Sequence, residues 1–389
     1  MDITELKSKI SAEIDSKAEG LRALSRQIHA NPEIGFREVK ASGWISEYLE
    51  REGFAVERNY CRLPTAFKAS YGQGKPVIGF LAEYDALPEI GHACGHNIIA
   101  AAAVGAALGA KIAGGLLNGT IQVVGTPAEE LYSGKAILAE RGGFNHLDAA
   151  MMVHPGNQDT AVVEALACHT LYIEFFGVAA HAASDPQAGT NALAAMILSF
   201  NNIDALRQHL PPKAMVHGII TDGGAAANVV PAHSAGNFIV RANTLATLEM
   251  VKQKILNCFS AAAVATGARL EYRWEEHYYA PVLNNLTLCK AYLRNLRQLG
   301  RKIRLQDPKE GFGSTDFGNV SHLVPGMHAQ LGITVKSAVV HSPQFAEAAI
   351  SATGLAAMLQ AAKGLAMTAA DLLASDSLLK KVKDEFAKK

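Results

Sequence analysis

Strand and helix patterns alternate between residues 77 and 153, and this alternation constrains the fold more than any other feature of the chain. Residues 77–82 form a continuous apolar run, as expected for a strand buried on both faces. A long apolar helix pattern starts at residue 98, followed by a strand over 120–125, a helix near 134–141 and a strand over 149–153. Strands that alternate with helices indicate a mostly parallel, doubly wound sheet, so the predicted fold class is α/β.

Polar residues of metal-binding type follow three of these strands. Asp85 lies just past the first strand, Glu129 and Glu130 lie just past the second, and His154 ends the third. Open α/β sheets bind ligands at the carboxyl ends of their strands, so these side chains are expected at one edge of the sheet. Of two adjacent carboxylates at such an edge, one can bind metal while the other acts as a general base.

The run from Gly91 to Asn97 carries one thiol and two imidazoles, directly before the apolar helix. Cys94 and His96 flank a single glycine, so both side chains can face the same cavity from a turn. Sulfur and nitrogen donors at this density favour a transition metal.

Each of these candidates also has a purely structural interpretation. A cysteine beside a histidine can be a buried residue next to a hydrogen-bonded one, and His154 can be a satisfied core residue. Adjacent glutamates on a helix usually face solvent, and His341 can help to close the start of the helix that follows it. The three separate strand ends that deliver donors favour the metal site over these alternatives.

The pattern changes near residue 166, where a second unit begins. Strand patterns occur at 170–176, 215–221, 236–241 and 269–274, with helices over 191–209 and 245–266. This β-α-β-β-α-β order is the ferredoxin-like arrangement. After Pro281 the chain returns to helix-rich segments. We therefore predict a ferredoxin-like domain at 166–278, inserted between the two parts of a first domain, 1–165 and 279–389.

Further elements are predicted toward both ends of the chain. Residues 3–29 and 39–51 have the apolar spacing of helices. A strand-like segment at 337–340 precedes a long apolar helix over 343–365, for which Ser342 suits the N-cap and Pro343 the first helical position. The basic segment 378–389 indicates a solvated amphipathic helix.

Composition narrows the class of partners. With 389 residues, two domains are the default expectation. Lys plus Arg and Asp plus Glu both total 36, so bulk charge does not favour a nucleic acid or an anionic membrane as a partner. The five scattered cysteines imply no disulfide framework and suit a reducing, cytoplasmic compartment. No signal peptide pattern is visible, and the apolar run 98–110 is expected to be a buried helix rather than a membrane span.

Taken as a set, the motifs resemble those of the M20 family of metallopeptidases and amidohydrolases. Within that family the match is to the branch of hippurate hydrolase, auxin-conjugate hydrolases and aminobenzoyl-glutamate hydrolase, and it covers nearly the whole chain. The resemblance implies a two-metal catalytic domain with an inserted ferredoxin-like domain that serves as a lid and for dimerisation. The motifs are SRQIHANPE from Ser25, DALP from Asp85, Cys94-Gly95-His96, Glu129-Glu130 and HSPQF from His341.

The resemblance also implies roles for individual residues. Glu129 would be the general base toward the attacking water, Asp85 would orient a ligand, and His181 would stabilise the oxyanion from a neighbouring subunit. Asn228 and Arg241 would hold the substrate's backbone and carboxylate. The implied cofactors are two divalent ions, zinc or manganese with cobalt also allowed, and the implied assembly is a homodimer. The metal ligands would be Cys94, His96, Glu130, His154 and His341.

Three positions depart from the pattern of many relatives. Asn97 stands where aspartate is usual, Ile99 where histidine is usual, and Thr315 interrupts a more usual Ser-Glu-Asp-Phe sequence. With these departures, the chain resembles the group around peptidase M20 domain-containing protein 2. That group resembles a dipeptidase acting on aminoacyl-lysine and similar basic dipeptides. The uncharged Asn97 is expected to alter metal affinity or preference.

The sequence is compatible with three classes of function. The favoured one is a metallohydrolase that cleaves the amide bond of a small dipeptide or N-acyl amino acid, with an aminobenzoyl-glutamate-type amidohydrolase as an alternative. A second is a hydrolase that uses Cys94 as nucleophile, which would be sensitive to alkylation and indifferent to chelators. A third is a non-catalytic scaffold that binds metal but hydrolyses no dipeptide or acyl-amino acid.

Overall fold

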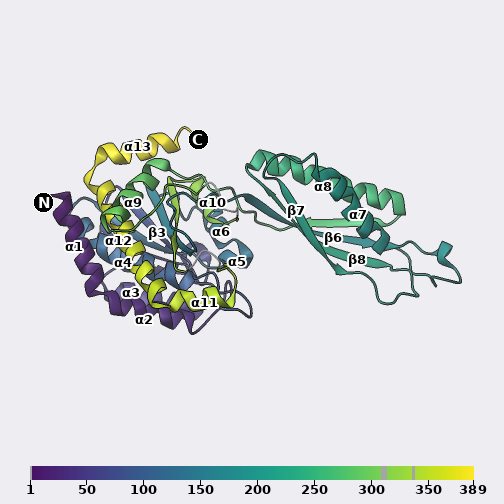
Figure 1. The fold of residues 1–389 in the computed structure, drawn as a ribbon, viewed down its shortest axis with the longest axis horizontal. Helices are drawn as coiled ribbons and strands as arrows, with labels where there is room; N and C mark the ends of the chain where they lie inside the picture. The colour runs from purple at the N-terminus through teal and green to yellow at the C-terminus, as the bar shows by residue number, and fades with distance from the viewer. Residues whose placement is uncertain (1, 308–312, 335–337) are drawn as a thin grey trace. The chain divides into compact units, whose positions relative to one another are not determined.

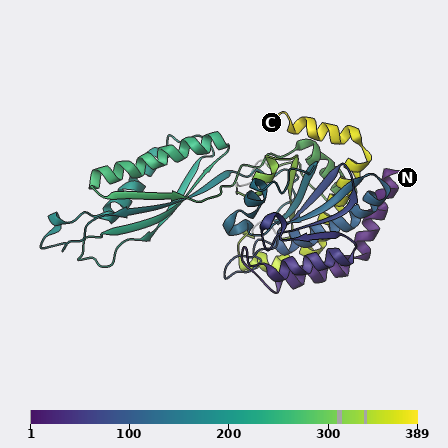
Figure 2. The same cartoon turned by 180° about the vertical axis from the view of Figure 1, so that it is seen from behind.

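The computed structural model describes residues 2–307, 313–334 and 338–389, which form two units (Figures 1 and 2). The first unit comprises Met1–Glu164, Val282–Gly311 and Asp316–Lys389, and the second comprises Ala165–Pro281 and Phe312–Thr315. Each unit has a hydrophobic core of its own.

The first unit is built on a six-stranded, mostly parallel sheet, which confirms the predicted α/β class. Its strands follow the order β1-β2-β4-β3-β5-β10; neighbours from β4 to β10 pair in parallel, whereas β1 and β2 add an antiparallel edge. The strands are β1 (Ala55–Arg58), β2 (Phe67–Gln73), β3 (Val77–Ala82), β4 (Gly119–Gly125), β5 (Ala149–Gly156) and β10 (Gly326–Gly332).

Helices cover both faces of this sheet because both faces are apolar. On β3, Ile78 and Phe80 belong to the large core beneath α4 and α12, whereas Leu81 belongs to a smaller core near α6 and α10. This double burial explains the continuous apolar run. The helices are α1 (Ile3–Ser16), α2 (Ala18–His29), α3 (Val39–Arg51), α4 (His96–Leu116), α5 (Glu129–Tyr132), α6 (Gly134–Glu140), α9 (Leu286–Gln298), α10 (Phe317–Ser321), α11 (Pro343–Ile350), α12 (Ala352–Ala374) and α13 (Asp376–Phe386).

Two helices predicted as continuous are broken, so those predictions were wrong. Helix 3–29 is interrupted at Lys17, which lets α1 contact α4 and α12 while α2 contacts α4 and α3. Helix 343–365 is interrupted at Ser351, whose extended backbone separates α11 from α12 with a bend of 64°. The Ser351 hydroxyl accepts a hydrogen bond from the Gly354 N–H at 3.0 Å and caps α12.

The strand predicted at 337–340 was also misplaced. Ser337 lies outside the described residues, and residues 338–340 form no strand. The sheet instead ends with β10, whose Met327 pairs with Met151 of β5 in parallel register. No strand was predicted for β1, β2 or β10; β1 and β2 are short or partly exposed, and β10 contains two glycines and a histidine, so none shows a simple apolar pattern.

Helix α4 is long and apolar enough to cross a membrane by length and composition. However, 78% of its apolar 18-residue stretch is buried inside the structure. Its small residues let it pack closely against its neighbours. A Cβ atom at Gly105 would come within 2.9 Å of Leu21, and one at Gly109 within 2.7 Å of Ile14. The burial and this close packing are those of a core helix.

The second unit is a four-stranded antiparallel sheet in the order β7-β8-β6-β9 with two helices on one face (Figure 1). Its chain order is β6 (Ala167–Phe176), α7 (Ala192–Arg207), β7 (Met215–Asp222), β8 (His233–Ala242), α8 (Leu245–Thr266) and β9 (Arg269–Trp274). Alternate residues of β6 and β8 are buried, since only the face toward α7 and α8 is covered.

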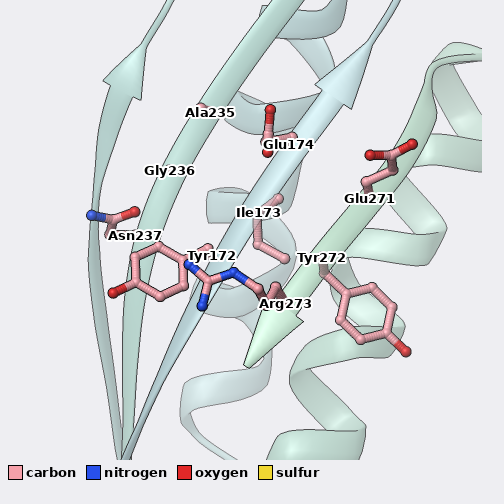
Figure 3. Close-up of a pocket in the computed structure, with 9 residues that line it drawn as sticks. All are labelled: Tyr172, Ile173, Glu174, Ala235, Gly236, Asn237, Glu271, Tyr272 and Arg273. Atoms are coloured by element: carbon pink, nitrogen blue, oxygen red, sulfur yellow. The ribbon is translucent and has the colours of Figure 1, made fainter. Parts of the chain in front are cut away.

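The other face of this sheet carries polar side chains (Figure 3). Tyr172, Asn237 and Arg273 line a shallow pocket there. The Tyr172 hydroxyl donates a hydrogen bond to Glu275 at 2.7 Å, and the Arg273 guanidinium lies 4.2 Å from the centre of the Tyr172 ring. Tyr172 is therefore in contact with both Glu275 and Arg273.

Candidate active site

The candidate site of the first unit lies where parallel strands end. Glu83 and Asp85 follow β3, Glu129 and Glu130 open α5 just after β4, and His154 lies near the end of β5. Because these strands pair in parallel, their carboxyl ends meet at one edge of the sheet.

The Cys94 turn brings its side chains to the same edge. Gly95 adopts a left-handed conformation (φ +80°), and a Cβ atom there would come within 2.6 Å of Pro155. Only glycine fits this position, which lies directly before α4. The Cys94 Sγ lies 3.3 Å from His154 Nε2, and donor atoms of Cys94, His96 and His154 all lie within 4.8 Å of one another.

A second group of donors adjoins the first. Donor atoms of Cys94, Glu130 and His341 also lie within 4.8 Å of one another. Glu130 Oε1 lies 3.7 Å from His96 Nε2 and 3.5 Å from His341 Nε2, so this carboxylate stands between two imidazoles. The loop before α11 is held in place because the His341 N–H donates a hydrogen bond to the Ala93 carbonyl at 3.0 Å.

Two buried atoms of this constellation have no hydrogen-bond partner among the described residues, namely His96 Nε2 and Glu130 Oε1. Leaving such atoms unpaired costs free energy unless something else satisfies them. A nitrogen, a carboxylate oxygen and a thiol that face a common point form a donor set suited to a transition metal ion. The residues present therefore fit a metal centre.

Neighbouring groups orient the imidazoles. His96 Nδ1 lies 2.9 Å from Asp85 Oδ1, which turns Nε2 toward the other donors. The second oxygen of Asp85 accepts the Glu130 N–H at 3.0 Å, and the charge of His96 outweighs burial to hold the Asp85 pKa below its usual value. His154 Nδ1 donates to the Pro155 carbonyl at 2.6 Å, which leaves Nε2 free to bind.

Glu129 is buried beside its neighbour Glu130. Its carboxylate lies within 4.8 Å of donor atoms in two groups, one formed with His96 and Glu130 and the other with Glu83 and Asp316. Burial, Glu83 and Glu130 together raise the pKa of Glu129 well above its usual value. A carboxylate with a raised pKa is suited to accept a proton near neutral pH. Ala128, just before it, adopts a left-handed conformation (φ 60°).

Glu38 holds the left-handed backbone of Ala128, which directly precedes Glu129. Its Oε1 accepts the Ala128 N–H at 2.8 Å, and its side chain is fully buried. Burial and the charge of Asp85 raise the pKa of Glu38 from 4.5 to about 7. The folded chain therefore binds a proton at Glu38 more tightly than the unfolded chain does.

Replacing Glu38 with glutamine should stabilise the metal-depleted protein at alkaline pH. The stabilisation that the protonated carboxyl group provides is complete below about pH 4.5 and is lost as pH rises through about 7. Glutamine keeps an acceptor for Ala128 without a charge. Urea unfolding should show the variant more stable by up to about 3 kcal/mol at pH 8, falling below about 1 kcal/mol at pH 5. An equal difference at both pH values would contradict this assignment.

Three buried residues at this edge were not predicted as site residues. Lys135 Nζ lies 2.5 Å from Glu83 Oε1 and 2.6 Å from Asp316 Oδ1, and all three side chains are almost fully buried. Burial alone would lower the pKa of Lys135, but the carboxylates of Asp316 and Glu83 raise it above its usual value. Glu83 could have been found from its place at a strand end, whereas Lys135 reads as an ordinary helix residue.

The second unit holds the other three predicted residues. His181 and Asn228 lie side by side, since His181 bridges to Val229 and the Ala182 N–H donates to the Asn228 carbonyl at 3.0 Å. The His181 Nδ1 accepts N–H groups of Ala183 and Ser184 at 3.2 Å, which leaves the proton on Nε2.

Arg241 is not brought to these residues. It lies near the far end of β8, whose first residue follows Asn228 closely in the chain, and it donates to the Ser314 hydroxyl at 2.5 Å. At about 3.3 Å per residue, Arg241 lies roughly 26 Å along the strand from its first residue, His233. Within this unit, the structure groups His181 with Asn228 and places Arg241 elsewhere.

The two departures on α4 have structural partners rather than a direct place in the donor set. The Asn97 amide donates to the Ser25 hydroxyl at 2.9 Å and toward the Ala349 carbonyl at 3.4 Å, tying α4 to α2 and α11. Ile99 is buried in the smaller core. The Asn97 amide nitrogen therefore fixes the position of the helix that carries His96.

Fold and site together define a two-unit α/β protein of the metallohydrolase type. The model of peptidase family M20/M25/M40 matches residues 79–365, and the chain belongs to this family. It is thus a hydrolase of amide or peptide bonds, and the family resemblance seen in the motifs is confirmed, including its amidohydrolase branch.

Similar proteins carry related names. An Xaa-Arg dipeptidase of Mus musculus is 40% identical over 98% of this chain and 92% of its own length. A p-aminobenzoyl-glutamate hydrolase subunit of Escherichia coli is 34% identical over 71% of this chain and 62% of its own length. A crystal structure of a dinuclear metal-binding M20 peptidase from Bacillus subtilis has a TM-score of 0.72 at 22% identity, over 92% of this chain and 99% of that one.

Proposed function

We propose that this chain is a two-metal hydrolase that cleaves a small dipeptide or N-acyl amino acid. The observation that carries the proposal is the convergence of sulfur, nitrogen and oxygen donors from distant segments; two of them are buried and have no hydrogen-bond partner in the part of the chain that the structure describes. The similar Bacillus subtilis protein is a dinuclear metal-binding peptidase, which supports two ions. The proposed ligands are Cys94, His96, Glu130, His154 and His341.

These residues suit zinc or manganese. The Cys94 thiolate favours zinc, whereas the carboxylate and imidazoles also accept manganese or cobalt. When bound, such ions activate water and polarise the scissile carbonyl. Asp85 keeps the His96 ring turned toward the donors through its 2.9 Å contact with Nδ1.

Glu129 is the proposed general base. Its carboxylate takes a proton from the attacking water and returns it to the leaving amine, because a group with a raised pKa can both accept and release a proton near pH 7. Glu38 holds the backbone just before it through the Ala128 N–H.

We propose that the second unit supports binding and assembly. The Nε2–H of His181 is free to donate to an oxyanion, and the neighbouring Asn228 can contact the substrate's backbone. Arg241 would pair with a carboxylate. In this proposal the chain is a homodimer in which His181 of one subunit serves the other. Light scattering should give twice the mass of the 41.2 kDa chain; a monomer with full activity would contradict it.

The proposed substrates are dipeptides with a basic C-terminal residue. Support comes from the Xaa-Arg dipeptidases of mouse and man, each 40% identical over 98% of the chain. The 34% identical aminobenzoyl-glutamate hydrolase subunit supports the alternative amidohydrolase activity. The separated cysteines, all of them free, favour a reducing, cytoplasmic location.

A substrate panel tests this proposal. Purified protein would be assayed with zinc, manganese or cobalt on alanyl-arginine, alanyl-lysine, alanyl-glutamate, p-aminobenzoyl-glutamate and N-acetyl amino acids. We expect kcat/KM to be highest for the basic dipeptides. A preference for p-aminobenzoyl-glutamate would favour the alternative amidohydrolase. No turnover of any compound, with metal retained, would favour a non-catalytic scaffold.

A further inference from the structure

Lys135 is a fully buried lysine at the edge of the candidate metal centre, and the proposed chemistry gives it no role. Its ammonium group contacts Glu83 Oε1 at 2.5 Å and Asp316 Oδ1 at 2.6 Å. Its backbone N–H donates to the second oxygen of Asp316 at 2.8 Å. Both ends of the residue are therefore fixed to the same carboxylate.

The carboxylates around Lys135 have the arrangement of a cation site. Oxygen atoms of Glu83, Glu129 and Asp316 lie within 4.8 Å of one another, and all three residues are buried. Buried carboxylates this close repel strongly unless a cation lies among them. Oxygen-rich groups of this kind suit hard divalent ions. The Lys135 ammonium lies in contact with two of the three and supplies that positive charge.

Glu83 connects this group to the donor set. One of its oxygens contacts Lys135, and the other lies 3.3 Å from His96 Nε2. The lysine thus determines which oxygen of Glu83 is available on the side of His96. Loss of the ammonium group would remove the positive charge that contacts Glu83 and Asp316.

Stability alone does not explain this arrangement. Burying an ammonium group carries a large desolvation cost, and buried ion pairs can often be replaced by apolar residues without loss of stability. Here, however, two of the three carboxylates face groups of the proposed centre, Glu83 facing His96 and Glu129 adjoining Glu130. A fixed charge at this place acts on the centre directly.

We propose that Lys135 is a positioning residue that serves as a built-in cation. Its ammonium group takes the place of a further divalent ion among Glu83, Glu129 and Asp316, and it holds Glu83 toward His96. The inference rests on the proposed two-metal function. It makes Lys135 and Asp316 determinants of how many ions the chain retains.

The test counts manganese in variants of the full chain. Lys135→Ala removes the charge and opens space beside the carboxylates, whereas Lys135→Arg keeps the charge as a conservative control. Each protein would be dialysed against excess Mn²⁺, separated from free ion by gel filtration and analysed by inductively coupled plasma mass spectrometry. We expect the alanine variant to retain about one Mn²⁺ more per chain than the wild type, and the arginine variant to match the wild type.

Thermal unfolding provides a second test that can be applied even if the Lys135→Ala variant is less stable than the wild type. Mn²⁺ should raise its midpoint of thermal unfolding more than that of the wild type, because an ion then replaces the lost charge. Turnover of alanyl-arginine should show a kcat reduced at least about tenfold with KM changed less than about threefold, and Lys135→Arg should restore most of the kcat.

The result separates this inference from the proposed function. A wild type that retains no Mn²⁺ would overturn the two-metal function itself. A wild type with two ions and a Lys135→Ala variant with the same two, and with the same thermal shift on adding Mn²⁺, would overturn only the role of Lys135.

Discussion

Glu129→Gln should reduce kcat by about three orders of magnitude while the protein keeps its metal. Glutamine matches glutamate in shape, but it cannot accept a proton from the attacking water. Because Glu129 is not among the five proposed ligands, the ion content should stay at the wild-type value. Steady-state kinetics on alanyl-arginine and metal analysis of the same preparation measure both effects.

Glu47→Gln is the matched control for this variant. It makes the same chemical change on the exposed face of α3, and we expect wild-type kinetics. If Glu129→Gln retained more than about a tenth of the wild-type kcat, Glu129 could not be the general base.

Removing the divalent ions should abolish turnover, which is the second of the two large effects on activity that we expect. Treatment with a chelator is expected to lower activity at least about a hundredfold, since metal ions contribute several kcal/mol to stabilising the transition state in such hydrolases. Adding zinc or manganese should restore it. Assays before chelation, after it and after re-addition measure the effect.

The chelation experiment also tests whether Cys94 acts as a nucleophile. Burial and the charge of Glu130 raise the pKa of the Cys94 thiol well above its usual value, which disfavours a free thiolate. We therefore expect an alkylating agent to modify Cys94 slowly, so that the metal-loaded protein keeps its activity. Full activity in the presence of chelator, together with loss on alkylation, would support the nucleophile instead.

The sequence was most informative where chemistry and regular structure coincide. Cys94, His96, Glu129, Glu130 and His154 could be found because each follows or ends a strand or opens a helix, and parallel strands bring such positions together. The structure gathers these side chains as expected. His341 was found by its motif, although the strand expected before it is not present in residues 338–340.

Other features could not be found because they depend on packing between distant segments. Lys135 looks like a solvent-facing helix residue until Glu83 and Asp316, the latter 181 residues away, are brought to it. The break at Ser351 arises where α11 and α12 turn by 64°, while the apolar spacing continues without a gap. Strand β10 pairs with β5 through residues that lack a simple apolar pattern.

The central claim is that donors far apart in the chain hold divalent ions together at one edge of the sheet. The most direct test is a crystal of the zinc- or manganese-loaded protein, with anomalous diffraction recorded on both sides of the metal edge. We predict two peaks among Cys94, His96, Glu130, His154 and His341, roughly 3.5–4 Å apart. The absence of any anomalous peak at these side chains, in protein loaded with excess metal, would contradict the account.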